Sequence, residues 1–140
     1  MRLLLATIIL IAIQDIVAAA SYHCTVMPGA TSLYQKDGRW EHRLERSDPA
    51  SASQELRVTL SDDGSHAATV EHVRFNHTAK AQWSEHTNVI MVVEPHELGG
   101  ISILSIFRDA AGKRPASYAR QAAIGYAGAA ALFSGFCEQR

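Results

Sequence analysis

The sequence predicts an all-β domain: an antiparallel up-and-down barrel or a two-sheet sandwich of about eight short strands, with its ends joined by a disulfide. Three observations predict this. Turn signals such as Asp37-Gly38, Asp63-Gly64 and Gly99-Gly100 separate short apolar segments. Several of those segments alternate apolar and polar side chains, as half-buried strands do. The two cysteines, Cys24 and Cys137, lie near opposite ends of the chain.

The N-terminal segment, residues 1–20, is predicted to be a cleaved signal peptide. Leu3 to Ile13 is apolar, and Ala18-Ala19-Ala20 has the small-residue pattern that signal peptidase recognises. A membrane-spanning helix is the alternative, but it needs about 20 apolar residues, and Asp15 interrupts the segment. We therefore expect an exported protein, periplasmic or secreted, with one β-domain over residues 21–140 and no transmembrane span after cleavage.

Export decides how the cysteines are interpreted, because thiols are oxidised outside the cytoplasm. An even pair then predicts a disulfide between Cys24 and Cys137. Bonded cysteines have Cα atoms within about 7 Å of each other, so the first and last segments of the domain must be neighbours. The alternatives are a metal pair or a catalytic thiol. Two cysteines without a Cys-x-x-Cys spacing make a poor zinc site, however, and no general base is associated with either.

The first half of the domain predicts three short strands. Residues 22–27 and 31–36 form two of them around the Pro28-Gly29 turn signal, and residues 56–60 alternate as a half-buried strand. Residues 39–46 are ambiguous, since their apolar side chains fit both a strand and a helical i, i+4 spacing. Residues 47–54, which contain Pro49 and three serines, are expected to be a loop.

The second half predicts the centre of the core. Residues 66–75 alternate as a strand. The apolar runs 89–93 and 101–107 form a hairpin through Gly99-Gly100, and both faces of this hairpin are expected to be covered. Residues 116–124 fit either a strand, which we favour, or a short helix. The last segment, 129–137, is rich in Ala, Ser and Gly, which suits a crowded seam beside the first strand; close approach by a ligand is the alternative.

The histidines are the first candidates for chemistry, but no two of them have the spacing of a metal site on one strand or one helix. On an uninterrupted strand, His72 and His77 would lie on opposite faces. The compact cluster is residues 94–97, where Glu94 and His96 are expected to face the same way. Glu94, His96 and Glu97 are therefore the candidate metal or acid/base residues, with a polar strand end as the alternative.

No catalytic residue is assigned. Ser134-Gly135 lacks the flanking glycine of a nucleophile elbow, and Ser84-Glu85-His86 are too close in sequence to form a triad on a strand. No glycine-rich phosphate loop opens a helix. The chain has 13 Lys and Arg against 14 Asp and Glu, which excludes the basic surface that nucleic-acid binding needs. We expect a protein that is not an enzyme and has no cofactor.

Two further features have an ordinary interpretation. The sequence Asn76-His77-Thr78 is a glycosylation sequon, which matters in a eukaryotic source. The larger aromatic residues are expected in the core or at a barrel rim, with a binding surface as the alternative: Trp40, Trp83, Tyr118 and Tyr126.

The two ends of the chain carry a family resemblance. Tyr22-His23-Cys24 and Ser134-Gly135-Phe136-Cys137-Glu138 resemble the ends of small uncharacterised exported bacterial β-proteins. Periplasmic lysozyme inhibitors share this general plan, which implies a small β-barrel with a disulfide near its ends. The Ser-Gly-x-x-Tyr recognition loop of those inhibitors is absent, because Ser134-Gly135 is followed by Phe136-Cys137. No inhibitory residue is therefore carried over to this chain.

The sequence has the pattern of a full β-domain but contains no recognisable catalytic motif, and this combination predicts a binding module. The first expectation is an exported, non-enzymatic β-domain that binds a protein or cell-envelope partner through loops on a rigid scaffold. The alternative is a calycin-like barrel that holds a small apolar ligand.

Overall fold

The structure is a computed structural model of the 140-residue chain, and it describes residues 20–34, 37, 39–44, 53–97, 99–108, 113–124 and 127–140. The predicted signal peptide lies outside these residues, apart from Ala20, and so does most of the predicted loop 47–54. The elements are β1 (Ser21–Tyr34), β2 (Trp40–Leu44), β3 (Gln54–Leu60), β4 (Ala67–His72), a 3-10 turn η1 (Val73–Phe75), β5 (His77–His86), β6 (Val89–Pro95), β7 (Gly100–Phe107), β8 (Lys113–Ile124) and β9 (Ala127–Gln139). In this part of the chain no helix is long and apolar enough to cross a membrane.

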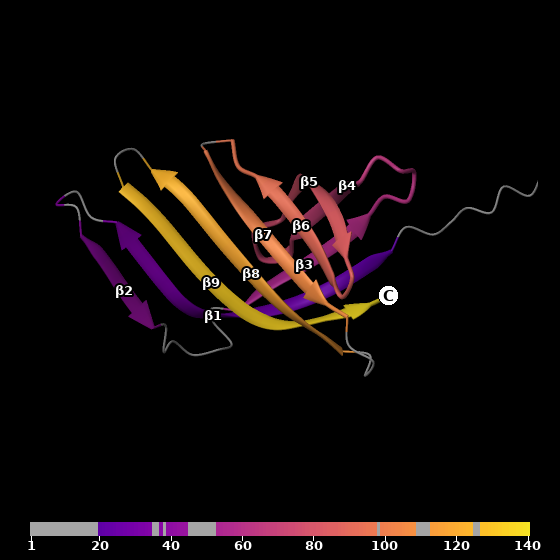
Figure 1. Ribbon diagram of the computed structural model, residues 1–140, viewed down its shortest axis with the longest axis horizontal. Coiled ribbons are helices and arrows are strands. Elements are labelled where there is room, and N and C mark those ends of the chain that lie inside the picture. The colour runs from indigo at the N-terminus through magenta and orange to yellow at the C-terminus, as the bar shows by residue number, and fades with distance from the viewer. Residues whose placement is uncertain are drawn as a thin grey trace, which may run out of the picture.

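The all-β prediction is confirmed, and the architecture is a closed barrel (Figure 1). Eight strands pair antiparallel in the order β1-β3-β4-β5-β6-β7-β8-β9, and β9 returns to pair with β1. The ninth strand, β2, pairs with β1 outside this ring. Closure of the ring satisfies the backbone groups that an open sheet would leave at its edges.

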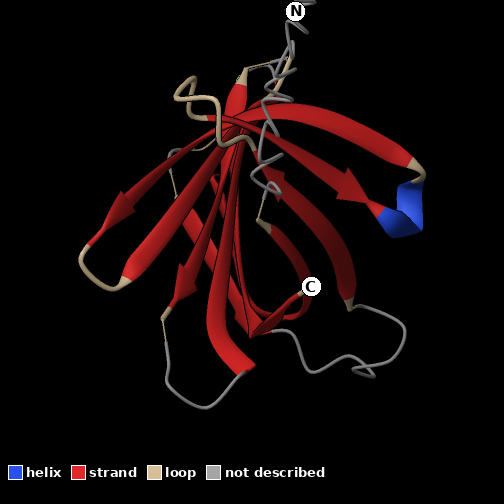
Figure 2. Cartoon of the chain, turned by 90° about the vertical axis from the view of Figure 1, so that its right-hand side faces the viewer, coloured by secondary structure: helices blue, strands red, loops and turns tan. Residues whose placement is uncertain are grey.

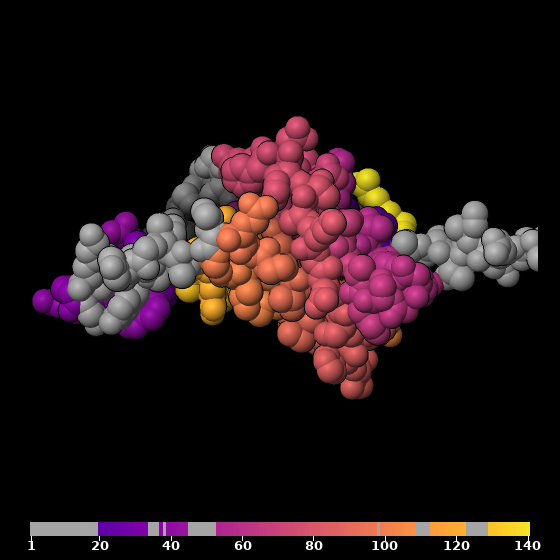
Figure 3. All heavy atoms as spheres, turned by 90° about the horizontal axis from the view of Figure 1, so that it is seen from above, coloured from indigo at the N-terminus to yellow at the C-terminus, as the bar shows by residue number. Residues whose placement is uncertain are grey.

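Strand β1 changes its neighbour halfway along. Ser21–Val26 pairs with β3, and Ala30–Tyr34 pairs with β2, while β9 follows β1 on the other side. The β1–β9 register shifts between Pro28 and Ala30. The two strands predicted at 22–27 and 31–36 are therefore one strand, because such an irregularity bends a strand without ending it. The ambiguous segment 39–46 contains β2, which lies at one end of the molecule in Figures 1 and 3.

The barrel interior is filled by side chains from all eight strands of the ring. The alternation predicted over residues 56–60 is confirmed, since Leu56, Val58 and Leu60 are buried. Trp83 packs against this core and donates its indole N–H to the Ser61 carbonyl, whereas Trp40 is exposed on β2. Tyr126 lies outside the described residues. The buried apolar core consists of Tyr22, Cys24, Val26, Leu56, Val58, Leu60, Ala68, Val70, Ala81, Ile90, Val92, Leu104, Ile106, Ala116, Tyr118, Phe133 and Cys137.

The predicted disulfide is confirmed at the seam where β1 and β9 close the barrel. Cys24 and Cys137 are register partners, both are fully buried, and they lie 113 positions apart in the sequence. Two residues away, a Cβ atom on Gly135 would lie 2.0 Å from the Thr25 carbonyl oxygen and 2.8 Å from the Val26 Cα. The seam is thus as crowded at Gly135 as the small residues of 129–137 predict.

The strand predicted over residues 66–75 is only partly correct. Strand β4 ends at His72, and the next three residues form η1, drawn in blue in Figure 2. Asn76 ends this turn in the left-handed conformation, with φ 47°. The turn breaks the two-residue alternation, so His72 and His77 become register partners with ring centroids 6.0 Å apart. The expectation that these histidines lie on opposite faces is therefore wrong.

The later strand predictions are confirmed, including the preference for a strand over a helix at residues 116–124. Strands β6 and β7 form the expected hairpin, which turns at Gly99 and Gly100, both with positive φ. One expectation about this hairpin is wrong. Its inward side chains are buried, but its outward side chains are partly or fully exposed. Each strand of a single barrel has only one face toward the core, and the described residues leave the other face of this hairpin partly or fully exposed.

This exposed surface continues over β8 and β9. The register aligns its outward side chains in rows such as Val93, Ile103, Ala119 and Leu132. We call it the uncharged face, and it comprises Val89, Met91, Val93, Pro95, Ile101, Ile103, Ser105, Phe107, Pro115, Ser117, Ala119, Gln121, Ala130, Leu132, Ser134 and Phe136. None of these side chains is charged.

The outward surface of β3–β5 has the opposite character. Glu55, Arg57, Glu71 and Lys80 project from it, and Arg57 pairs with Glu71 across the two strands. We call this surface the polar face. One outer side of the barrel is therefore polar, as a sheet face in contact with water is. The other is mainly apolar, as a sheet face that packs under another layer is.

Candidate functional site

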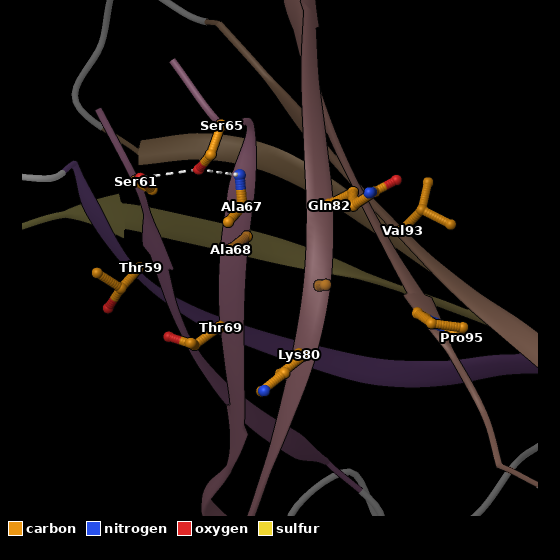
Figure 4. A pocket seen from close by; sticks show the side chains of 11 residues that line it. Thr59, Ser61, Ser65, Ala67, Ala68, Thr69, Lys80, Gln82, Val93 and Pro95 are labelled. Carbon is orange, nitrogen blue, oxygen red and sulfur yellow. Dashed lines mark hydrogen bonds between the residues drawn. The ribbon is translucent and has the colours of Figure 1, made fainter. Parts of the chain in front are cut away.

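The barrel wall opens between β5 and β6. Their register runs from His86–Val89 to Gln82–Val93, although β5 continues back to His77 and β6 continues to Pro95. Figure 4 shows the two strands running apart from Gln82 toward Lys80 and Pro95. Pro95 has no N–H to donate to a neighbouring strand, which favours separation at this point. We call this opening, formed by residues 77–81 and 94–97, the β5–β6 slot.

Two depressions meet at the slot and share Lys80 and Pro95. The first has a volume of about 970 Å³ and lies over β3–β6, lined mainly by small side chains such as Ala67 and Thr69. The second has a volume of about 840 Å³ and lies beside η1 and the β6–β7 turn. This second depression gathers the titratable side chains of the region: His72, His77, Lys80, Glu94, His96, Glu97 and Arg120.

A buried polar cluster lies at the second depression. Ser102 is 1% exposed, and its neighbour in the register is Glu94, which is 6% exposed. Tyr118 donates its hydroxyl proton to Ser102 Oγ at 3.0 Å, and Ser102 Oγ lies 2.7 Å from His96 Nε2. Since Ser102 already accepts from Tyr118, it can donate its own proton to His96. In the described residues, every buried side-chain nitrogen and oxygen atom has a hydrogen-bond partner.

Glu94 has its own partner in this cluster. His72 Nε2 lies 2.9 Å from one Glu94 carboxylate oxygen and 3.1 Å from the other. Both side chains are about nine-tenths buried. A carboxylate removed from water needs such a charge-assisted contact, because its desolvation is costly. The contact forms because His72 continues the inward series of β4 and Glu94 that of β6.

The structure places the three predicted site residues in two different environments. Glu94 and His96 both contribute to the buried cluster, whereas Glu97 is exposed and lines the second depression. Glu94 is therefore buried and in hydrogen-bond contact with His72. Across the residues that the structure describes, no group of three or more His, Cys, Asp or Glu side chains is arranged to hold a metal ion.

Sequence reasoning missed the other members of the cluster. Ser102 was detectable, because it is the polar member of the inward series Ser102, Leu104 and Ile106 on β7. Tyr118 and Arg120 follow the same alternation on β8, but only the β7–β8 register places Arg120 beside Ser102. His72 also carried a signal, because it continues the inward series of Ala68 and Val70 on β4; only the structure shows that Glu94 is its partner.

The Ser102–His96 contact has the residue types of a nucleophile and its base. The Ser102 side chain is fully buried, however, and its hydroxyl is occupied by Tyr118 and His96. We therefore assign Ser102 a positioning role: it connects β7 to Tyr118 on β8 and holds the His96 ring at the edge of the slot.

Burial raises the pKa of the Tyr118 hydroxyl above its ordinary value, against the lowering effect of the Ser102 hydrogen bond; the Glu94 charge raises it further. Above about pH 10 an unfolded tyrosine loses its proton while folded Tyr118 keeps it. The folded state then binds more protons than the unfolded state, so stability falls as the pH rises through this range.

We expect the ultraviolet difference titration of wild type against Tyr118→Phe to show a tyrosine that ionises above about pH 10. The same substitution should flatten the alkaline loss of stability, measured by urea unfolding at several pH values. A difference titration centred at or below pH 10 would contradict the raised pKa.

No known protein-family model matches this chain, and a search of curated proteins finds no significant match.

Proposed function

We propose that this protein is an exported, non-enzymatic binding domain, periplasmic or secreted, that binds a protein or cell-envelope partner through the uncharged face. The observation that carries the proposal is the exposure of large apolar side chains on one side of the barrel. Leu132, Phe136 and Phe107 are 51%, 55% and 41% exposed. Four strands about 4.8 Å apart, with four outward residues each, present roughly 400–500 Å². Most of the side chains on this face are apolar, although Ser105, Ser117, Gln121 and Ser134 are polar. Exposed, mainly apolar surfaces of this size commonly mark interaction sites.

The chemistry of the face supports a macromolecular partner. The face itself carries no charged group, and the adjoining outward pair of β8 and β9, Lys113 and Glu138, lies at its border. Burying the face therefore incurs little of the desolvation cost that charged surfaces incur. Strands β6 and β7 carry mainly apolar side chains on both faces, as strands that are buried on both faces do. The barrel core covers their inward face, and a bound partner would cover their outward face. The buried Cys24–Cys137 disulfide fits an oxidising compartment and holds this surface rigid. The general plan shared with periplasmic lysozyme inhibitors is also one that binds a protein.

The test places charge on the uncharged face. We expect the double variant Leu132→Lys, Phe136→Lys to bind the partner at least about 100-fold more weakly, because two large apolar side chains would leave the interface. Native mass spectrometry of the wild-type protein from its own source identifies the partner. Titration of the purified partner with both proteins then measures the change. Hydrogen exchange should show protection of β6–β9 in the complex.

The matched control puts the same charges on the polar face. Thr69→Lys with Gln82→Lys changes two exposed outward positions of β4 and β5, and we expect partner binding within about twofold of wild type. Binding that survives the Leu132→Lys, Phe136→Lys change, or protection confined to the polar face, would refute the proposal.

A second candidate function is the holding of a small ligand, and the β5–β6 slot favours it. The barrel interior is filled by side chains, so the room for a ligand is in the two depressions at the slot rather than at the barrel centre. Depressions of this size match those of small-molecule sites.

A further inference from the structure

Two cationic side chains at the slot have no ion-pair partner among the described residues. The side chains of Lys80 and Arg120 make no hydrogen bond and no ion pair with any described residue, although both line the second depression. Elsewhere the described cations are mostly engaged: Arg39, Arg43, Arg57, Arg108 and Lys113 pair with carboxylates, and Arg114 and Arg140 contact polar side chains. The two described cations without a side-chain partner therefore lie at the same place, the second depression.

Among the described residues, neither acid near these cations forms an ion pair with them. Glu94 lines the same depression, but its two oxygens are occupied by His72 Nε2 and its side chain is buried. Glu97 is exposed to water, which screens its charge. Arg120 pairs with Ser102 in the β7–β8 register and is exposed at the second depression, whereas Lys80 projects outward from β5.

The remaining lining of the depression is apolar or aromatic. Phe75 is 62% exposed there, and Ala79, Pro95 and Ala122 complete the apolar surface. His77 and His96 add ring nitrogens that can donate to oxygen atoms. Unpaired cations beside apolar walls are what an anion with an apolar body requires, because the guanidinium binds a carboxylate in bidentate fashion while the walls cover the chain.

We propose that the β5–β6 slot binds a small amphipathic carboxylate, with its carboxylate held by Arg120 and Lys80 and its apolar part against Phe75, Pro95 and Ala122. This inference rests on the second function proposed above, a barrel that holds a small ligand, and it is independent of the uncharged face. The ligand enters through the gap between β5 and β6 and leaves the core intact.

The experiment titrates the full mature protein with decanoate. Decanol is the neutral counterpart, and acetate is a carboxylate that lacks the long alkyl chain. We expect decanoate to bind most tightly, and Arg120→Gln with Lys80→Gln to weaken it at least about tenfold, since each charge-assisted contact is worth more than a neutral one. Arg120→Lys should keep part of the affinity. In wild type, shifts of the His72, His77 and His96 ring resonances locate the ligand at the slot.

Lys113→Gln is the matched control, because Lys113 is an exposed cation outside both depressions; decanoate affinity should stay within twofold of wild type. Equal binding of decanoate and decanol, unchanged by Arg120→Gln with Lys80→Gln, would overturn the anion site while leaving a ligand-holding barrel. Absence of binding by both compounds up to millimolar concentration would overturn the site and the ligand-holding function together.

Discussion

Replacing both cysteines, Cys24→Ala with Cys137→Ala, is expected to lower the free energy of unfolding by about 3–5 kcal/mol. The disulfide closes a loop of 113 positions, so its removal restores a large conformational freedom to the unfolded chain. Both side chains are fully buried at the β1–β9 seam, which adds lost packing to the entropic effect. The melting temperature should fall on the order of 10–20 °C, and urea unfolding of oxidised wild type against the double variant measures the change.

Reductant is the internal control for this experiment. Dithiothreitol should bring wild type close to the double variant in urea, and it should leave the double variant unchanged. A double variant that is within about 0.5 kcal/mol of oxidised wild type would show that the barrel closes without help from the bond.

Gly135→Ala is expected to destabilise the barrel by at least about 3 kcal/mol, the upper range for overpacking. The new Cβ would lie 2.0 Å from the Thr25 carbonyl oxygen, which is backbone and cannot rotate away. The adjacent Cys24–Cys137 bond also prevents β1 and β9 from moving apart to make room. Urea unfolding gives the free energy, and an unchanged m value would show that the same core is exposed on unfolding.

Gly29→Ala is the matched control on the same seam. Its Cβ would meet the Leu132 carbonyl oxygen at 3.5 Å, an ordinary contact, and Gly29 does not have a positive φ. Its effect should be within about 1 kcal/mol of zero in either direction. Equal effects of the two alanines would mean that close approach of the backbones is not what requires glycine at position 135.

Much of the fold was predictable because local patterns in the sequence determine the turns and strands. Turn glycines such as Gly99 and Gly100 need positive φ, and the alternation of Leu56, Val58 and Leu60 follows directly from the pleat of a strand. The oxidised Cys24–Cys137 pair then brings the first and last strands together. Barrel closure itself was left open, since a barrel and a sandwich share the same local patterns.

The polar cluster was less predictable, because it depends on which face each side chain occupies. A single short turn, Val73–Phe75, interrupts the expected alternation and places His77 opposite His72. Glu94 and His96 were recognised as neighbours from their spacing, but their partners lie on other strands, His72 on β4 being 22 positions from Glu94 and Ser102 on β7 being 6 positions from His96. Register between strands is a property of the whole sheet.

The amino-acid sequence alone determined most of the strand content, the hairpin turns, the disulfide and the small residues at the closing seam, because each follows from backbone conformation or side-chain size at its own position. No pattern predicted strand β5, His77–His86. Only the tertiary structure decided which apolar side chains are covered. The runs in β6 and β7 are apolar on both sides, yet closure into one ring buries only the inward series. The uncharged face and the two unpaired cations at the β5–β6 slot both result from closure of the ring and from the register between its strands.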